Sequence, residues 1–246
     1  MTERGFKLWR WATVFFANVP NLILVVWLFF WVTRTGRAQA PAAPWCNLGL
    51  FALFAGIHSA MSTPRYKRWF TARWPAAFER AVFTIVAGVT LLALMALWRP
   101  MPRALWEIEG PAGWALDALY WIAFAGAASV STVFDQAAFA GTRQLSAHYK
   151  GKALPAPEFH VRGWFRWSRN PMYFFMIVLM WSASTMTTGR LLFAAVSTAY
   201  FIIGARFEER RHLRELGETY AKYQRGVSMF VPLPNRYAPD DAGGTA

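Results

Sequence analysis

The sequence is short of cysteine and of acidic residues, and each shortage narrows the class of protein. A single cysteine, Cys46, stands among 246 residues, so the chain can form no internal disulfide and cannot hold an iron–sulfur cluster on its own thiolates. Cys46 is interpreted as a packing residue. The 13 Asp and Glu are outnumbered by 26 Lys and Arg, and the formal net charge is +13. This excess has to be explained by nucleic acid or by anionic lipid.

Charged residues of both signs make up only 16% of the chain, whereas 56% is hydrophobic and 17% is aromatic. A soluble domain is about 45–50% apolar. The cations are dispersed between apolar runs and form no basic face, which argues against nucleic acid and favours lipid headgroups as neighbours. The first apolar run, residues 11–32, is too long for the apolar part of a signal peptide and lacks a small-residue cleavage site. It is interpreted as a retained anchor.

Six apolar segments approach the roughly 20 residues that a helix needs to cross a bilayer. They are predicted at residues 11–33, 46–62, 81–98, 113–134, 171–187 and 191–206. The connecting segments alternate in charge, with 21 Lys and Arg on one side of the membrane and 5 on the other. The excess of cations on cytoplasmic loops places both termini in the cytoplasm. The predicted fold is an all-α, polytopic membrane bundle of about six transmembrane helices.

The C-terminal part of the chain predicts a helical hairpin and an interfacial helix. Only residues 187–190 separate the last two spans, so Gly189 is expected to take a left-handed turn conformation. Residues 207–225 alternate charges with apolar residues at helical spacing, which is typical of an amphipathic helix on the membrane surface. The small, polar residues 238–246 favour a flexible tail.

Two polar clusters flank this hairpin. The first is Arg166-Trp-Ser-Arg169-Asn170-Pro171-Met172-Tyr173, in which Pro171 marks the start of a helix whose N-terminus suits an anion. The second, Arg206 to Arg211, contains the adjacent acids Glu208 and Glu209, which are costly near hydrocarbon unless they are paired or used. The hairpin brings both clusters to similar depth. The simpler interpretations are an interfacial anchor for the first cluster and a salt-bridge cluster for the second.

These residues resemble the C-terminal module of integral-membrane methyltransferases, including isoprenylcysteine carboxyl and phospholipid methyltransferases. The resemblance rests on the two clusters and on two motifs nearer the C-terminus, Gly217-Glu-x-Tyr220-x-x-Tyr223 and Val231-Pro232. It implies S-adenosylmethionine as the methyl donor, bound near the cytoplasmic face. The family usually has histidine where this chain has Asn170, which can make a hydrogen bond but cannot carry its charge.

Further motifs are similar to those of the bacterial methanethiol S-methyltransferase branch. They are His58-Ser-Ala-Met-Ser-Thr-Pro, Glu79-Arg80, Trp98-Arg-Pro100, Phe134-Asp135, Gly141-x-Arg143-Gln144 and Thr185-Met-Thr-x-Gly189. The resemblance runs from about residue 50 to 234. It implies methylation of methanethiol to dimethyl sulfide in the inner membrane of a bacterium. Residues 1–150 are then expected to form a transmembrane bundle with the thiol site, residues 151–234 the cofactor module, and residues 235–246 a tail.

The resemblance also implies site residues. The expected cofactor-binding residues are His160, Gly163, Trp164, Arg169, Asn170, Pro171, Tyr173, Glu208 and Glu209. For the thiol, the hypothesis is that Asp135, with His58, accepts the proton while Arg143 stabilises the thiolate, which is the nucleophilic form. The alternatives are a helix cap for Asp135, a buried structural role for His58 and an exposed loop position for His160. No spacing of histidines and carboxylates indicates a metal site.

Two other functions stay open on the sequence. The substrate could be larger and lipid-like, such as a prenylcysteine or an amine headgroup. A membrane electron carrier that binds haem through His58 and His148 belongs to a different class. A transporter is disfavoured because the spans lack paired ionisable residues placed symmetrically in two halves. The sequence gives no indication of the oligomeric state.

Overall fold

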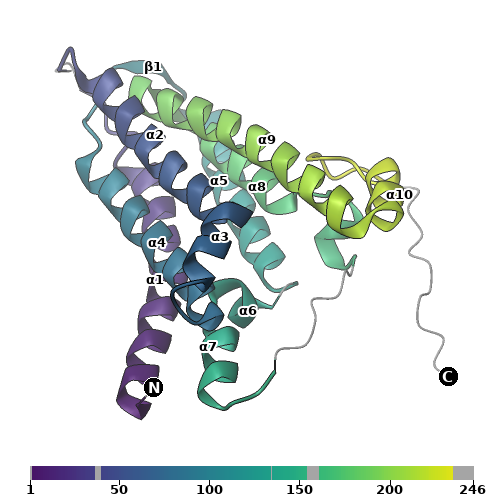
Figure 1. Cartoon of the computed structure of the whole chain (residues 1–246). Helices are drawn as coiled ribbons and strands as arrows, with labels where there is room; N and C mark the ends of the chain where they lie inside the picture. The colour runs from purple at the N-terminus through teal and green to yellow at the C-terminus, as the bar shows by residue number, and fades with distance from the viewer. Residues whose placement is uncertain (1, 37–39, 134, 154–160, 235–246) are drawn as a thin grey trace. The chain divides into compact units, whose positions relative to one another are not determined.

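The computed structural model describes residues 2–36, 40–133, 135–153 and 161–234. Helices dominate this part of the chain, and a two-stranded sheet interrupts them, so the predicted all-α class is confirmed (Figure 1). The chain divides into two compact units. The first unit contains the described residues up to 108, those of 135–153, and Thr185–Leu192. The second contains those of 109–133, 161–184 and from 193 onward.

The first unit is built on three long helices that pack against one another. Helix α1 packs against α4, and α4 also packs against α2. Its elements are α1 (Glu3–Phe30), α2 (Ala43–Ser62), α3 (Pro64–Thr71), the 3-10 helix η1 (Ala76–Phe78), α4 (Glu79–Leu97), β1 (Ala104–Glu107), α6 (Gln136–Ala140), α7 (Thr142–Tyr149) and β2 (Thr185–Thr187). The short helices α6 and α7 pack against each other, against α1 and against the start of α4.

The second unit is organised around the packing of α5 against α8. Its elements are α5 (Gly110–Ser131), the 3-10 helix η2 (Gly163–Arg166), α8 (Pro171–Trp181), most of α9 (Thr188–Leu216) and α10 (Glu218–Gly226). Gly126 allows the close approach of α5 and α8, because a Cβ atom there would lie 2.3 Å from the ring of Phe175. Helix α8 begins at Pro171, which confirms the start that the sequence predicted for it.

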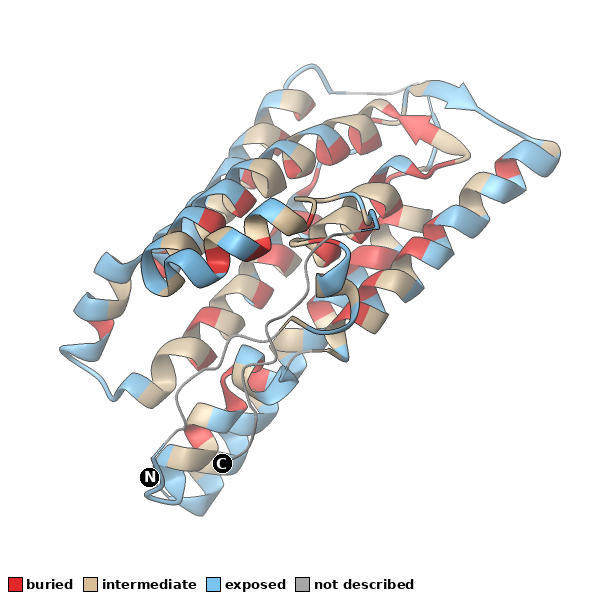
Figure 2. Ribbon diagram, turned by 90° about the vertical axis from the view of Figure 1, so that its right-hand side faces the viewer, coloured by how far each residue is buried: buried red, intermediate tan, exposed pale blue. Residues whose placement is uncertain are grey.

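Within the described residues, four helical segments are long and apolar enough to cross a membrane: α1, the segment Ala76–Leu97, α5 and α9. Helix α8 is apolar but has only 11 residues. The predicted number of six spans is therefore not confirmed. Figure 2 shows that the long helices carry many exposed residues beside the buried ones. Large apolar side chains are among the exposed ones, including Leu22, Phe30, Leu53 and Ile122, and apolar exposure on this scale marks a surface made for lipid.

The connection between α8 and α9 differs from its prediction. Helix α8 ends at Trp181, and residues Thr185–Thr187 pair with β1 as the antiparallel strand β2 before α9 begins at Thr188. Gly189 therefore lies inside a helix and does not have a positive φ. It is needed for a close approach, because a Cβ atom there would lie 3.3 Å from the Cβ and carbonyl oxygen of Met101.

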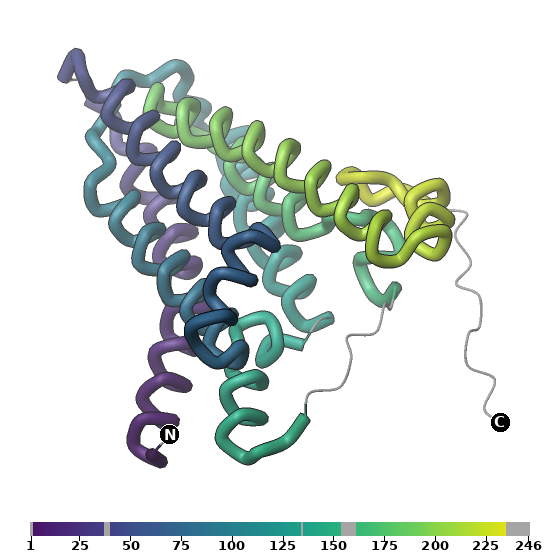
Figure 3. The backbone as a smooth tube through the Cα atoms, in the orientation of Figure 1, coloured from purple at the N-terminus to yellow at the C-terminus, as the bar shows by residue number. Residues whose placement is uncertain are grey.

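The predicted interfacial helix of residues 207–225 is also wrong as a single element. Helix α9 continues to Leu216, and the chain breaks at Gly217, whose φ of +55° favours glycine (Figure 3). Helix α10 then folds back, so that Tyr220, Tyr223 and Val227 form a small core with Leu213 and Leu216. The apolar residues that were expected to face lipid pack against one another. The predicted tail, residues 235–246, lies outside the described residues.

Candidate functional site

Arg169 and Glu209 form a buried ion pair in the second unit, which we call the clasp. The Nε of Arg169 donates to Oε1 of Glu209 at 2.6 Å, and Nη2 donates to Oε2 at 3.2 Å. Only 9% and 8% of the two side chains is exposed. The remaining nitrogen, Nη1, donates to the backbone carbonyls of Gln224, at 2.8 Å, and Val227. The hairpin thus brings the two sequence clusters together, as predicted, but most of the Arg169 guanidinium is committed to the protein itself.

Glu209 is fully used as an acceptor. Besides the two bonds from Arg169, it accepts from Nδ2 of Asn170 at 3.4 Å and from Nε2 of Gln224 at 2.9 Å. Asn170 also donates to the carbonyl of Met229 at 3.2 Å. The amide that donates these bonds is neutral, so at this position an asparagine performs its role without the charge that a histidine could carry.

The segment after α10 runs alongside the entrance to α8. The backbone N–H groups of Arg169 and Asn170 donate to the carbonyls of Ser228 and Met229 at 2.9 and 3.1 Å. Ser168 and Ser228 form an isolated parallel bridge, and the hydroxyl of Tyr223 donates to the carbonyl of Phe165 at 2.7 Å. The clasp therefore ties three pieces of chain together: the start of α8, the later part of α9, and α10 with the residues directly after it.

Glu208 is placed differently from its neighbour. Its side chain is 41% exposed, whereas that of Glu209 is 8% exposed. It accepts a hydrogen bond from the Tyr173 hydroxyl at 3.4 Å and lies 3.8 Å from Nε2 of His212. The Tyr173 ring stacks on Phe201 with a centroid distance of 5.0 Å, which fixes its direction. Of the two acids, Glu208 is the one with surface left for a ligand.

Tyr220 closes the cluster from α10. Its side chain is buried and its ring lies 5.1 Å from that of His212. Burial raises the pKa of the Tyr220 phenol, and the nearby Glu209 carboxylate raises it further. The phenol therefore stays neutral at physiological pH.

The residues expected near the adenine lie in the packing of α5 and α8. Nε1 of Trp164 donates to Oγ of Ser129 at 2.8 Å, and its ring meets Phe175 edge-on at 4.9 Å. Gly163 has a φ of +52°, and a Cβ atom there would lie 2.8 Å from Val133. His160 lies outside the described residues.

In the first unit, Asp135 and Arg143 form an ion pair of 2.7 Å. Asp135 is also the N-cap of α6, because its carboxylate accepts from the N–H groups of Ala137 and Ala138 at 3.0 and 3.1 Å. The side chains are 33% and 51% exposed for Asp135 and Arg143. The cap was the simpler alternative for Asp135, and the structure confirms it.

Arg80 and Gly141 hold this segment against the start of α4. Nε of Arg80 donates to the carbonyl of Phe139 at 2.6 Å, and its guanidinium lies 4.8 Å from the Phe139 ring centroid. Gly141 has a φ of +98°, and a Cβ atom there would lie 2.6 Å from the backbone nitrogen of Ala81. The Asp135–Arg143 pair is therefore exposed but held on a fixed support.

His58 lies in an aromatic environment on α2. Its ring is 4.8 Å from Phe83 and 5.8 Å from Phe54, measured between centroids. The guanidinium of Arg80 lies 4.8 Å from the same Phe83 ring. His148, the other histidine of the haem alternative, is exposed on α7 and meets Phe78 edge-on at 5.6 Å.

Gln224 is a site residue that the sequence did not predict. It donates to Glu209 through its side chain and accepts from Arg169 through its carbonyl. Nothing in its local spacing separates it from the other polar residues of α10. The backbone partners Ser228 and Met229 were missed because a main-chain carbonyl can accept a hydrogen bond whatever the residue type.

Comparisons with known proteins identify a matching family and several relatives. The family model described as phospholipid methyltransferase matches residues 120–221, which contain the clasp, Glu208 and Tyr173. A methanethiol S-methyltransferase of Mycobacterium tuberculosis is 33% identical over 241 residues, which cover 93% of this chain and 99% of that protein. Methanethiol S-methyltransferase 1 of Bradyrhizobium diazoefficiens is 37% identical, and the match covers 81% of this chain and 70% of that protein. Nurim of Homo sapiens is 31% identical, with 68% of each chain covered. No solved structure matches.

The apolar helices and the family match define the class as integral-membrane methyltransferases. Within that class, the identity over nearly the whole length of the Mycobacterium tuberculosis protein is decisive. The chain belongs to the methanethiol S-methyltransferase family.

Proposed function

We propose that the protein transfers a methyl group from S-adenosylmethionine to a small thiol, converting methanethiol to dimethyl sulfide within the membrane. The names of the bacterial relatives support this substrate. The observation that carries the proposal is the meeting of residues 169–173 with Glu208 and Glu209 in one cluster. A charged and hydrogen-bonding cluster of this kind, beside apolar helices, suits a polar nucleoside whose reactive end must reach an apolar substrate.

The residues around Glu208 fit the donor. When bound, S-adenosylmethionine supplies an electrophilic methyl group on a sulfonium sulfur. The part-exposed carboxylate of Glu208 would accept hydrogen bonds from ribose hydroxyls or from the ammonium group. The N-terminus of α8, which begins at Pro171, would attract the carboxylate of the donor, with Asn170 and Tyr173 beside it.

Arg169 and Glu209 would contribute by positioning other parts of the site and would not contact the donor themselves. Their bonds to each other and to Gln224 leave little for a ligand, so we assign them the task of holding α8 and α10 around the donor. Gly163 and Trp164, with His160, are the proposed cover for the adenine. The bond from Trp164 to Ser129 would keep the indole in a fixed orientation.

Removal of the thiol proton is assigned to the first unit. Asp135, with His58, would accept the proton, and Arg143 would stabilise the thiolate that remains. The Asp135–Arg143 pair supports this assignment, because it holds a carboxylate and a cation together with part of each side chain exposed. An apolar surrounding then favours attack of an anion on a cation, because charge is lost in the transition state.

The enzyme is proposed to lie in the bacterial inner membrane with both termini in the cytoplasm. The distribution of Lys and Arg supports this orientation, because 21 of them fall on the segments assigned to the cytoplasm. Residues 1–150 would contain the thiol site, and residues 151–234 the donor site.

The experiment is methyl transfer by the purified protein in detergent, with S-adenosylmethionine and methanethiol supplied and the headspace analysed by gas chromatography. Dimethyl sulfide is the expected product. Asp135→Asn is expected to lower the rate about a hundredfold, and His58→Ala to lower it less, because a positioned acceptor contributes about 10²–10⁴-fold. Wild-type rates in both variants would remove the assigned acceptors, while failure of the wild type to form the thioether would remove the substrate.

A lipid-like substrate, such as a prenylcysteine or an amine headgroup, is the second candidate, and the names of the bacterial relatives do not favour it. Methylated lipid in an extract of the reaction, with no thioether in the headspace, would support this candidate. The haem alternative predicts a Soret band in the purified protein, and a colourless active preparation excludes it.

A further inference from the structure

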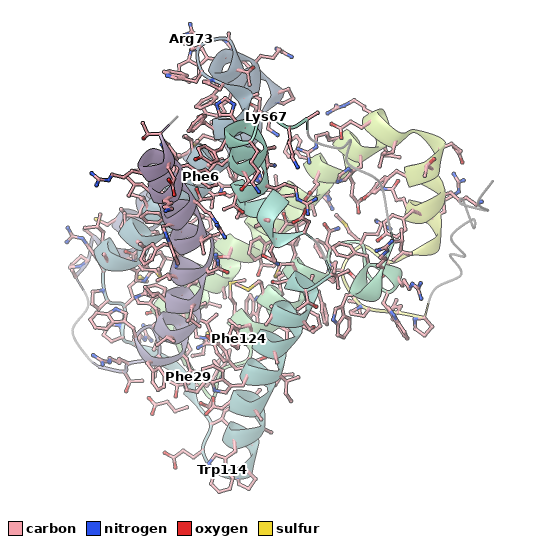
Figure 4. The ribbon with its side chains drawn as sticks, turned by 90° about the horizontal axis from the view of Figure 1, so that it is seen from below. Phe6, Phe29, Lys67, Arg73, Trp114 and Phe124 are labelled. Atoms are coloured by element: carbon pink, nitrogen blue, oxygen red, sulfur yellow. The ribbon has the colours of Figure 1, made fainter. Side chains whose placement is uncertain are left out.

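A cavity of about 380 Å³ lies in the first unit, and no residue assigned to methyl transfer lines it. It opens where α1 and α4 end. Trp31 follows the last residue of α1 and Trp98 follows the last residue of α4, and both line the cavity. Figure 4 labels Phe29 near this end of α1 and Phe6 near the opposite end.

The cavity has an apolar side and a polar side. The apolar side consists of Trp31, Val32, Trp98, Pro100, Met101 and Pro102. The polar side is the short run Arg34-Thr35-Gly36, whose residues are exposed. A ligand that satisfies both sides is an amphiphile, with a polar group beside Arg34 and an apolar body between the two tryptophans.

The position along the helices indicates the headgroup layer of a membrane. Both α1 and the segment Ala76–Leu97 are long and apolar enough to cross a bilayer, and the cavity begins directly after their last residues. Tryptophan concentrates at this depth because its ring is apolar and its N–H is polar. The cavity therefore lies where lipid headgroups and the first acyl carbons are found.

The charge around the cavity selects an anion. The guanidinium of Arg34 lies 5.0 Å from the Trp31 ring centroid, and within the described residues no ion pair joins it to a carboxylate. The neighbouring described segments, residues 31–36 and 98–103, also contain Arg99 and Arg103 and no acidic residue. A planar guanidinium that is already stacked on an aromatic ring is well suited to bind a phosphate.

The walls of the cavity are tied together by the protein. The N–H of Gly36 donates to the carbonyl of Pro102 at 3.0 Å, and Nδ2 of Asn47 donates to the carbonyl of Arg99 at 2.9 Å. The hydroxyl of Thr187 donates to the carbonyl of Val32 at 2.5 Å. The two lining segments are thus held in place without a ligand, so little ordering is needed when a ligand binds.

We propose that this cavity binds one anionic phospholipid, with its phosphate on Arg34 and its glycerol and first acyl carbons between Trp31 and Trp98. The shape supplies the apolar contact, and the uncompensated guanidinium supplies the preference for negative charge. This binding is independent of the methyl-transfer chemistry.

The test is a lipid titration of the full-length protein, measured by native mass spectrometry after release from detergent and without any methyl donor. Dioleoyl phosphatidylglycerol is compared with dioleoyl phosphatidylcholine. The wild type is expected to bind one phosphatidylglycerol more tightly than phosphatidylcholine. Arg34→Gln is expected to weaken the first phosphatidylglycerol about fivefold, the effect of one surface cation on an anionic lipid, and to leave phosphatidylcholine unchanged.

Two matched variants make the result specific. Arg103→Gln removes an exposed cation of the neighbouring segment that does not line the cavity, and it should bind as the wild type does. Arg34→Lys keeps the charge and should retain most of the preference. The proposal is overturned if Arg34→Gln binds phosphatidylglycerol as tightly as the wild type does. It is equally overturned if an excess of inorganic phosphate displaces the lipid completely, because the site would then recognise a free anion.

Discussion

Two arginine–carboxylate pairs, one in each unit, have almost the same length and opposite surroundings. Arg169 and Glu209 lie 2.6 Å apart with less than a tenth of either side chain exposed, and Arg143 and Asp135 lie 2.7 Å apart with 51% and 33% exposed. In the buried pair, Gln224 and Asn170 take up the remaining acceptor positions of Glu209. In the exposed pair, a large part of each side chain stays accessible. Distance alone therefore does not separate a structural ion pair from one that has capacity left for chemistry, whereas burial and the remaining hydrogen-bond capacity do.

The largest effect on stability is expected from Glu209→Gln. Removing one charge of a buried pair leaves the other uncompensated, which costs about 3 to 5 kcal/mol of the free energy of unfolding. Thermal and chemical unfolding in detergent would measure it. Glu208→Gln is the matched control, because the same change is made one residue earlier on a part-exposed side chain. Equal losses in the two variants would contradict the distinction between the clasp and Glu208.

A smaller loss is expected from Arg169→Lys. Lysine keeps the positive charge but cannot bind both oxygens of Glu209 and the carbonyls of Gln224 and Val227 at once. The loss of charge-assisted hydrogen bonds predicts about 2 kcal/mol of destabilisation in the same unfolding experiment. Arg143→Lys is the control in the exposed pair and should leave stability unchanged. If Arg169→Lys unfolds like the wild type, charge alone holds the clasp.

The smallest effect is expected from Asp135→Asn. Asparagine is an equally good N-cap for α6, so only an exposed ion pair is lost, which is worth about 0.2 to 1 kcal/mol. Circular dichroism during heating would show a nearly unchanged unfolding curve, even though the rate of methyl transfer is expected to fall. A large destabilisation would place Asp135 among the structural residues and would make its rate uninformative.

The sequence was sufficient to predict the meeting of residues 169–173 with Glu208 and Glu209, because a hairpin of two helices returns the chain to its starting level. It was not sufficient to separate the two acids. Their exposure is set by α10, which folds back only because Gly217 adopts a positive φ and ends α9. The single predicted helix over 207–225 hid that reversal and, with it, Gln224.

The prediction of a tight turn between α8 and α9 was wrong for a similar reason. Residues 185–187 become a strand because they pair with residues 104–107, a contact that no local pattern reveals. Gly189 is needed for its small size beside Met101 and not for a left-handed conformation. For Asp135 the local pattern did suffice, since an acidic residue directly before a short helix is a common cap.

The central claim is that Glu208, next to the clasp, faces the methyl donor, and a titration with S-adenosylhomocysteine tests it most directly. Isothermal titration calorimetry in detergent would compare the wild type with Glu208→Gln. We expect the wild type to bind and the variant to bind about tenfold more weakly, because one charge-assisted contact is lost, with no change in the unfolding temperature. Equal affinities, or no binding to a folded wild type, would contradict the account.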